Sequence, residues 1–167
     1  ANVSDVSVQE VYGELKKILN EVVEPTIFLD ADGSYSFDSV KEIVAELEKG
    51  TDVVSGSRFL SHRSRPEGMS RLHHFGNIAL SRLSSIRNRR KISDLCTGLW
   101  GFNAHSLQSL DFTSQGFDLE AELAGLSRRN NLKHSEIPVK WSQRKGGTSK
   151  LRSLTDGLII FFRIIRT

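Results

Sequence analysis

The chain has 167 residues, of which 38% are hydrophobic and 26% are charged, proportions typical of an ordinary globular domain. This length predicts one domain, residues 1–167, with its own core. The single Cys96 excludes an internal disulfide, the polar N-terminus predicts no signal peptide, and no apolar run is long enough to predict a membrane-spanning helix. The net charge is only +3, but the many arginines and few acids between Arg58 and Arg90 suggest an anionic partner.

Residues 7–23 predict an amphipathic helix, because apolar residues recur there at spacings of three and four. Glu24 and Pro25 end it, and we expect no chemistry from this segment. We therefore divide the chain into an atypical N-terminal helix at 1–24, a catalytic portion at 25–152 and an apolar helix at 153–167.

The central stretch is a short apolar run at 27–29 that predicts a buried strand ending in Asp30 and Asp32. Residues i and i+2 of an extended segment point the same way, so both carboxylates can converge on one divalent cation, or one can hold a metal and the other a sugar. Carboxylate oxygens are ligands that Mg²⁺ and Mn²⁺ prefer. In open α/β sheets, ligands bind beyond the carboxyl ends of the strands.

Three other interpretations compete for this stretch. The first is an acidic turn that caps the next helix. The second, a calcium loop of the EF-hand type, needs Gly and Glu at positions that hold Tyr35 and Lys41, and it is therefore excluded. The third is a phosphatase of the haloacid dehalogenase type with Asp30 as nucleophile, which requires a later acidic pair that we do not find.

The next elements predict a βαβ unit. Residues 37–49 predict a helix that Gly50 stops, and residues 51–56 predict a strand that delivers Arg58. The pattern implies parallel neighbouring strands that end at one edge of the sheet, which places Arg58 on the same side as Asp30 and Asp32. Residues 60–70 predict a loop.

A helix follows at 71–86, with apolar residues at helical spacing. Its adjacent His73 and His74 point to different faces and are therefore poor co-ligands for a metal. At 91–102, Gly98 and Gly101 flank Trp100, which suggests close backbone approach and either a ligand platform or ordinary core.

Residues 117–126 predict another helix, in which Asp118 and Glu122 share a face while Glu120 lies roughly opposite and can point inward. Residues 137–141 predict a strand, and Pro138 suits the edge of a sheet.

Two glycines with cations and hydroxyls at 144–151 suit a flexible loop that grips phosphate, although the spacing is not that of a Walker loop. The last helix, at 154–165, has a length suited to a membrane interface, with a core helix as the alternative.

Several of these motifs, taken in order, resemble the family 2 glycosyltransferases, and more narrowly their dolichol-phosphate mannose synthase and polyprenyl-phosphate glycosyltransferase branch. The motifs are Asp30-Ala31-Asp32, Gly56-Ser57-Arg58, Ser93-Asp94 with Thr97-Gly98, Phe117 to Glu122, and Gly146 to Leu151. The resemblance implies an α/β fold of the GT-A type, a Rossmann-like sheet with flanking helices. The family begins with a further stretch that holds the first strand and the nucleoside-binding site, which residues 7–23 do not resemble, so we expect a sheet incomplete at its N-terminal side.

The resemblance also implies roles for the acidic residues. Asp32 would bind Mg²⁺ or Mn²⁺ on the donor diphosphate, Asp30 would assist with the metal or the sugar, and Glu120 would lie near the acceptor. Where mannose synthases often carry Gln shortly after the acidic pair, this chain has Ser34.

The expected substrate-binding residues follow from the same resemblance and from the motifs above. Arg58 and Arg71 match positions that grip the lipid phosphate, and the late loop closes on the donor phosphates. The full set is Arg58, Arg71, Asp94, Trp100, Arg144, Ser149 and Lys150.

The activity that the resemblance implies is an inverting, metal-dependent transfer of a hexose from a GDP- or UDP-hexose to a polyprenyl (dolichyl) phosphate. We expect it at the cytoplasmic face of a membrane, which the C-terminal helix would contact, without nucleic acid as a partner. Two alternatives stay open, a truncated glycosyltransferase that only binds a partner and the phosphatase above. Nucleic-acid binding by the cations at 87–91 is a weaker one.

Overall fold

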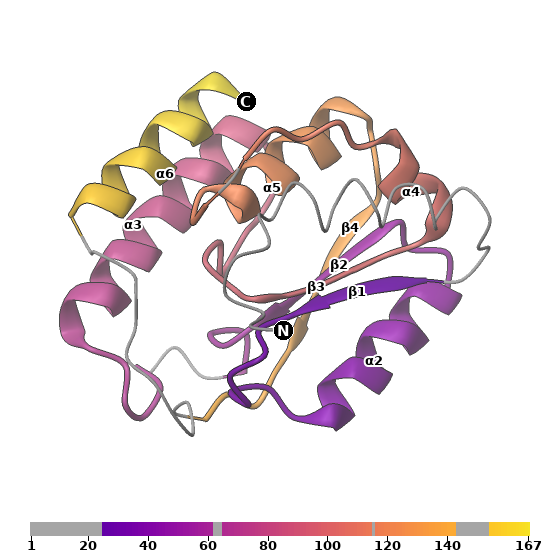
Figure 1. The fold of residues 1–167 in the computed structure, drawn as a ribbon, viewed down its shortest axis with the longest axis horizontal. Coiled ribbons are helices and arrows are strands. Elements are labelled where there is room, and N and C mark those ends of the chain that lie inside the picture. The colour runs from indigo at the N-terminus through magenta and orange to yellow at the C-terminus, as the bar shows by residue number, and fades with distance from the viewer. Residues whose placement is uncertain (1–24, 62–64, 115, 143–153) are drawn as a thin grey trace, which may run out of the picture.

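A computed structural model describes residues 25–61, 65–114, 116–142 and 154–167 (Figure 1). Their elements, in chain order, are β1 (Thr26–Leu29), α2 (Phe37–Glu48), β2 (Val53–Ser57), α3 (Arg71–Asn88), β3 (Leu99–Phe102), α4 (Ala104–Ser109), α5 (Leu119–Arg129), β4 (His134–Pro138) and α6 (Thr155–Arg166). The predicted α/β class is confirmed. The predicted helix at 7–23 and the whole late loop at 144–151 lie outside the described residues.

The four strands form one mixed sheet in the order β1-β3-β2-β4. Strand β3 runs antiparallel to β1 on one side and to β2 on the other, and β2 runs parallel to β4. The prediction that β1 and β2 are neighbours is wrong, because β3 lies between them, with Gly101 opposite both Ile27 and Val54. Both strands nevertheless point the same way, so they end at one edge of the sheet as predicted. Strand β4 is an edge strand, as Pro138 suggested, but it spans His134–Pro138 and not the predicted 137–141.

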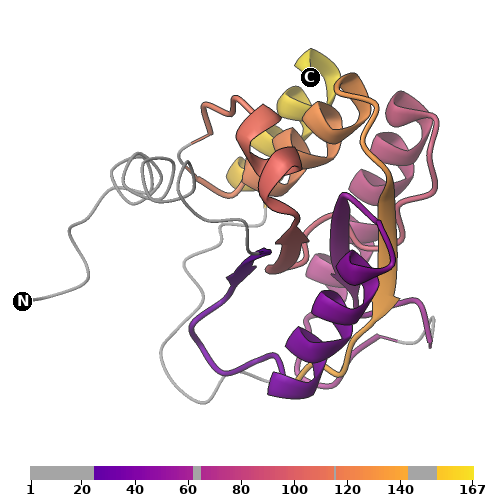
Figure 2. The ribbon, with the colours of Figure 1, turned by 90° about the vertical axis from the view of Figure 1, so that its right-hand side faces the viewer.

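The two faces of the sheet are covered by different helices (Figures 1 and 2). Toward α2, a small core joins Ile43 and Leu47 to Val54 and Leu99. On the opposite face, a larger core joins residues of β2 and β3 to α3, α5 and α6. The alternation along each strand sends consecutive side chains to opposite cores, which makes this a three-layer α/β/α structure.

Gly101 of β3 is needed for the packing of α2. A Cβ atom added at Gly101 would lie 2.2 Å from Cγ2 of Ile43. The close backbone approach that the sequence suggested at this position is therefore present. It allows α2 to pack against β3, and it does not serve a ligand.

Helix α3 buries a polar face. Its buried residues are Asn77, Ser81, Ser84 and Asn88, at spacings of four, three and four, which place them on one side of the helix. Its large apolar residues Leu72, Phe75 and Ile86 are 56%, 72% and 77% exposed. The reason is a polar network beneath α3, described below.

Helix α6 places Ile160 and Ile164 in the larger core and leaves its other side exposed, with Leu158 and Phe162 59% and 53% accessible. Within the described ranges, no helix has both the length and the hydropathy to cross a membrane.

Candidate functional site

The turn after β1 carries the acidic pair. The backbone N–H of Asp30 donates to the carbonyl of Gly98 at 3.0 Å, which extends the pairing of β1 and β3 by one residue. The carboxylate of Asp30 lies directly on Gly98, since a Cβ atom there would be 2.0 Å from Oδ2 of Asp30. Asp32 Oδ1 accepts a hydrogen bond from the backbone of Ser34 at 3.0 Å, and Gly33 between them has a φ of 74°. The helix-capping alternative does not hold, because Ser36 is the N-cap of α2.

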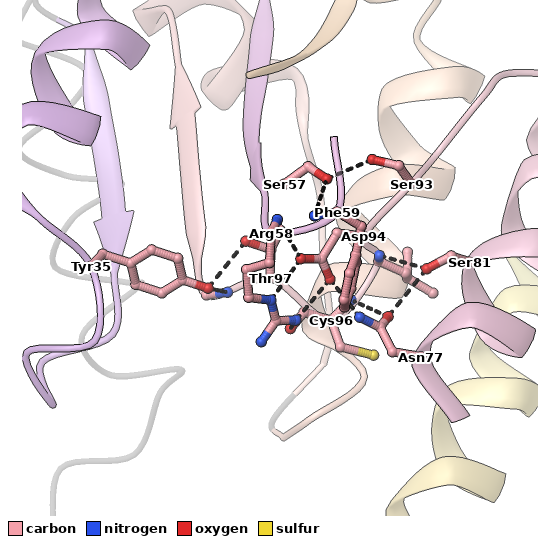
Figure 3. Close-up of polar contacts among 12 residues, drawn as sticks. Tyr35, Ser57, Arg58, Phe59, Asn77, Ser81, Ser93, Asp94, Cys96 and Thr97 are labelled. Atoms are coloured by element: carbon pink, nitrogen blue, oxygen red, sulfur yellow. Dashed lines mark hydrogen bonds and ion pairs between the residues drawn. The ribbon is translucent and has the colours of Figure 1, made fainter. Parts of the chain in front are cut away.

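Two further contacts fix this turn to the sheet. The hydroxyl of Tyr35 accepts from the backbone N–H of Gly98 at 2.9 Å and is hydrogen-bonded to Thr97 at 3.2 Å (Figure 3). On the other side, the backbone N–H of Ser142 donates to the carbonyl of Ser34 at 2.9 Å. Ser142, two residues before the late loop in the sequence, is thus held against the acidic turn.

Replacement of Gly98 by Ala tests this close approach. We expect G98A to fold, because the exposed carboxylate of Asp30 can rotate away, but to weaken metal-dependent binding of a nucleotide sugar at least about tenfold, the lower end of the cost of disturbing a ligand's support. Equilibrium dialysis measures this. G76A is the matched control, because a Cβ atom at Gly76 meets nothing within 4 Å. Equal affinity in G98A and the wild type would show that the position of Asp30 does not matter.

Glu120 lies in the first turn of α5 and faces the acidic turn. Burial raises the pKa of its carboxyl to about 8, against an opposing hydrogen bond from its own backbone N–H. Repulsion from Asp30 and Asp118 raises that pKa further, and attraction to Arg58 lowers it. Residues directly after β1 and β2 and in the first turn of α5 therefore share one electrostatic environment, and the prediction that Glu120 points inward is confirmed.

The raised pKa makes Glu120 costly to the fold when it is ionised. The folded protein retains this proton up to about pH 8, whereas the ordinary value is 4.5, so stability falls as pH rises between these values. We expect E120Q, in the absence of divalent cations, to gain stability relative to the wild type across that window. Urea unfolding at several pH values measures the difference, and parallel pH profiles of the two proteins would contradict the assignment.

Arg58 and Asp94 form a buried ion pair at the centre of the site (Figure 3). Arg58 donates to Asp94 through Nε at 2.6 Å and through Nη2 at 2.7 Å, and its backbone N–H adds a third bond at 3.0 Å. Burial lowers the pKa of Arg58, but its attraction to Asp94 outweighs this and the net direction is upward. Asp94 is 1% exposed, so the prediction that it contacts substrate does not fit the structure, and its role is to hold Arg58.

Asn77 of α3 completes this pair, and our sequence analysis missed it. Its Nδ2 donates to Asp94 at 2.6 Å, while its Oδ1 accepts from Ser81 at 3.1 Å and from the backbone of Cys96 at 3.2 Å. The regular spacing of buried Asn and Ser along α3 was the available signal. A helix face of this kind predicts a satisfied polar network, since buried polar groups are almost always paired.

One nitrogen of the Arg58 guanidinium, Nη1, is available to a ligand. Nη2 of Arg58 also donates to the carbonyl of Cys96 at 2.6 Å, but Nη1 makes no hydrogen bond with any residue in the described part of the chain. The predicted contact with a lipid phosphate therefore stays possible through Nη1 alone.

The other predicted substrate-binding residues lie in three different settings. Trp100 is 2% exposed, donates from Nε1 to the carbonyl of Thr97 at 2.9 Å and stacks on Phe102 and His134. This corresponds to the core alternative and not to a ligand platform. Arg71 is exposed at the start of α3. Arg144, Ser149 and Lys150 lie outside the described residues.

Helix α6 is tied to the start of α5 by Arg163. This side chain donates to Asp118 at 2.6 Å and to Glu122 at 3.0 Å, which confirms that these two carboxylates share a face. Since Glu120 lies between them in the sequence, Arg163 fixes the helix turn that aims Glu120 at the acidic turn.

An α/β domain that gathers an acidic turn, a buried arginine and a helix-borne carboxyl at one sheet edge has the layout of an enzyme site in an open α/β sheet. Residues 24–111, just over half of the chain, match the family described as glycosyl transferase family 2. The chain belongs to this family. The match gives no support to the phosphatase alternative.

Three relatives illustrate the likeness. Glycosyltransferase AglJ of Haloferax volcanii is 30% identical over 84% of this chain and 46% of its own length. The dolichyl-phosphate hexose transferase of the same organism is 29% identical over 82% of this chain and 58% of its length. The polyprenol monophosphomannose synthase of Mycolicibacterium smegmatis is 24% identical over 74% of this chain and 47% of its length. The chain spans about half the length of these relatives.

Proposed function

We propose that this chain contributes the metal-binding and acceptor-facing part of an inverting hexosyltransferase whose donor is a nucleotide sugar and whose acceptor is a polyprenyl phosphate. The observation that carries this proposal is the meeting of Asp30, Glu120 and Arg58 at one edge of the sheet. The names of two relatives, a dolichyl-phosphate hexose transferase and a polyprenol monophosphomannose synthase, support the class of acceptor.

The residues present fit a divalent cation that is shared with a donor. In the described part of the chain, no cluster of three or more His, Cys, Asp or Glu side chains could hold a metal without help. Mg²⁺ commonly binds through one or two carboxylates plus substrate phosphates, and Asp30 and Asp32 offer that number. The repulsion of Asp30 on Glu120 also marks an excess of negative charge that a cation would relieve. When bound, the metal would neutralise charge on the leaving diphosphate.

The reaction requires little proton transfer. An ionised oxygen of the acceptor phosphate attacks the anomeric carbon, the bond from that carbon to the donor diphosphate breaks, and the nucleoside diphosphate leaves with inversion. Before a cation binds, Glu120 keeps its proton at neutral pH, so it is suited to donate a hydrogen bond and not to act as a base. Asp94 orients the guanidinium of Arg58, and Nη1 of this guanidinium is the candidate donor to the acceptor phosphate.

A membrane surface as partner is supported by the exposed apolar residues of two packed helices. Helix α6 exposes Leu158, Ile159, Phe161, Phe162 and Ile165, and helix α3 exposes Leu72, Phe75 and Ile86. The two helices pack against each other, and an amphipathic helix with such a face lies in the membrane interface. We propose that this face brings the site to the lipid acceptor, at the cytoplasmic side.

Transfer of labelled hexose from GDP-mannose or UDP-glucose to a polyprenyl phosphate in vesicles, with Mn²⁺ present, tests the proposed function. We expect label in the organic extract, and none after chelation of the metal. Binding of the metal without binding of either donor would instead favour a non-catalytic module.

A further inference from the structure

A pocket lies on a different side of α3 from Leu80 and Leu83, which pack against the core that contains α6 residues. It has a volume of about 350 Å³, within the usual range for small-molecule sites. Its lining comes from three segments, namely the residues shortly after β2, the middle of α3, and the three residues before Asp94. The lining residues are Phe59, Leu60, Ile78, Ser81, Arg82, Lys91, Ile92 and Ser93.

The pocket has an apolar floor and a basic rim. Phe59 and Ile92 are 8% and 4% exposed and form the floor, whereas Arg82, Lys91 and Leu60 are exposed. The lining contains no carboxylate. Arg82 and Lys91 make no ion pair or hydrogen bond with another residue in the described ranges, so both cations are available to an anion.

The position of the pocket relates it to the exposed apolar residues of α3. Arg82 follows Phe75 by seven residues, two helical turns, so it borders both the pocket and the exposed apolar face. Leu80 and Leu83, which pack against the core that contains α6 residues, lie on another side of α3. None of the acidic residues of the candidate site lines this pocket.

We propose that this pocket binds the head group of an anionic phospholipid, separately from the acceptor site. Arg82 and Lys91 hold the phosphate, as guanidinium and ammonium groups do, and the apolar floor contacts the glycerol and first methylenes. The inference rests on the proposed membrane location of the domain.

Sedimentation with vesicles tests this site. The probes are vesicles of phosphatidylglycerol in phosphatidylcholine and vesicles of phosphatidylcholine alone. We expect R82Q/K91Q to bind the anionic vesicles at least about tenfold more weakly than the wild type, on the scale of about 1 kcal/mol per cation near an anionic surface. R87Q/K133Q removes the same charge from exposed positions outside the pocket, and we expect a change of less than about twofold.

I78W fills the pocket without a change of charge, and we expect it to lose the same affinity while its thermal unfolding stays cooperative. Equal losses in the two charge variants would overturn the proposal, because they would show a diffuse electrostatic effect only. Loss of binding only to phosphatidylcholine vesicles that carry polyprenyl phosphate would also overturn it and assign the pocket to the acceptor. Donor binding by calorimetry, unchanged in all these variants, separates failure of this site from failure of the proposed function.

Discussion

D32A is expected to lose metal-dependent binding of the nucleotide sugar by a factor of at least about a hundred, the upper end of the cost of disturbing a ligand's surroundings. In D32A, the turn loses the carboxylate that accepts a hydrogen bond from the backbone N–H of Ser34. Asp30 then remains as the single protein ligand that the turn offers to the cation. Equilibrium dialysis of labelled donor with Mn²⁺ present and absent measures this.

D38A is the matched control for D32A. Asp38 follows the acidic turn, its carboxylate is exposed, and in the part of the chain that the structure describes it pairs only with Lys41. D32A and D38A each remove one negative charge, so the two variants have the same net charge. Retention of metal-dependent donor binding in D32A would mean that the metal has other ligands and that the acidic turn does not form its site.

D94A is expected to destabilise the fold by about 3–5 kcal/mol, the usual cost of leaving one partner of a buried ion pair without the other. The side chains of Arg58 and Asp94 are only 10% and 0% exposed, and three donors converge on Asp94 from Arg58 while Asn77 provides a fourth. Urea unfolding measures the loss. D38A breaks an exposed pair in the same protein and is expected to cost less than about 1 kcal/mol.

The double variant D94A/R58L separates pairing from packing. Because it removes both charges together, we expect it to recover part of the stability that D94A loses. Equal losses of unfolding free energy in D94A and D38A would mean that Arg58 has another partner and that Asp94 is not the residue that holds it.

Much of the site was predictable because strand ends and turn residues have strong local signals. The apolar run before Asp30 and Asp32 predicted β1, and the run before Arg58 predicted β2, so the shared edge followed from their direction. The prediction that β1 is buried was wrong, because β1 is an edge strand and Leu29 is 46% exposed. The pairing order did not follow, because it depends on β3, whose four buried residues insert between β1 and β2. A local pattern carries no information about which strand arrives in the middle.

The role of Asp94 depends on a contact that sequence spacing cannot show. Asp94 and Arg58 are 36 positions apart, and Asn77 reaches the pair from a helix between them. In the sequence, Asp94 has the same appearance as a ligand carboxylate. Only its burial and its four donors show that it serves the arginine.

Helix α3 shows the opposite situation, in which the pattern was visible but its usual interpretation misleads. Its apolar residues recur at helical spacing, which ordinarily indicates the core. Here the most buried side is polar, because Asn77 and Ser81 satisfy backbone groups at 95–96. Leu80 and Leu83 pack against the larger core, but the apolar residues Leu72, Phe75 and Ile86 are exposed.

Calorimetric titration of the folded chain with GDP and UDP sugars, with Mn²⁺ present and then removed by chelator, tests the central claim most directly. The account predicts binding that requires the metal and that disappears in D32A. Binding that persists unchanged after chelation, or no binding by protein shown to be folded in the presence of Mn²⁺, would contradict the assignment of the acidic turn as the donor and metal site of this chain.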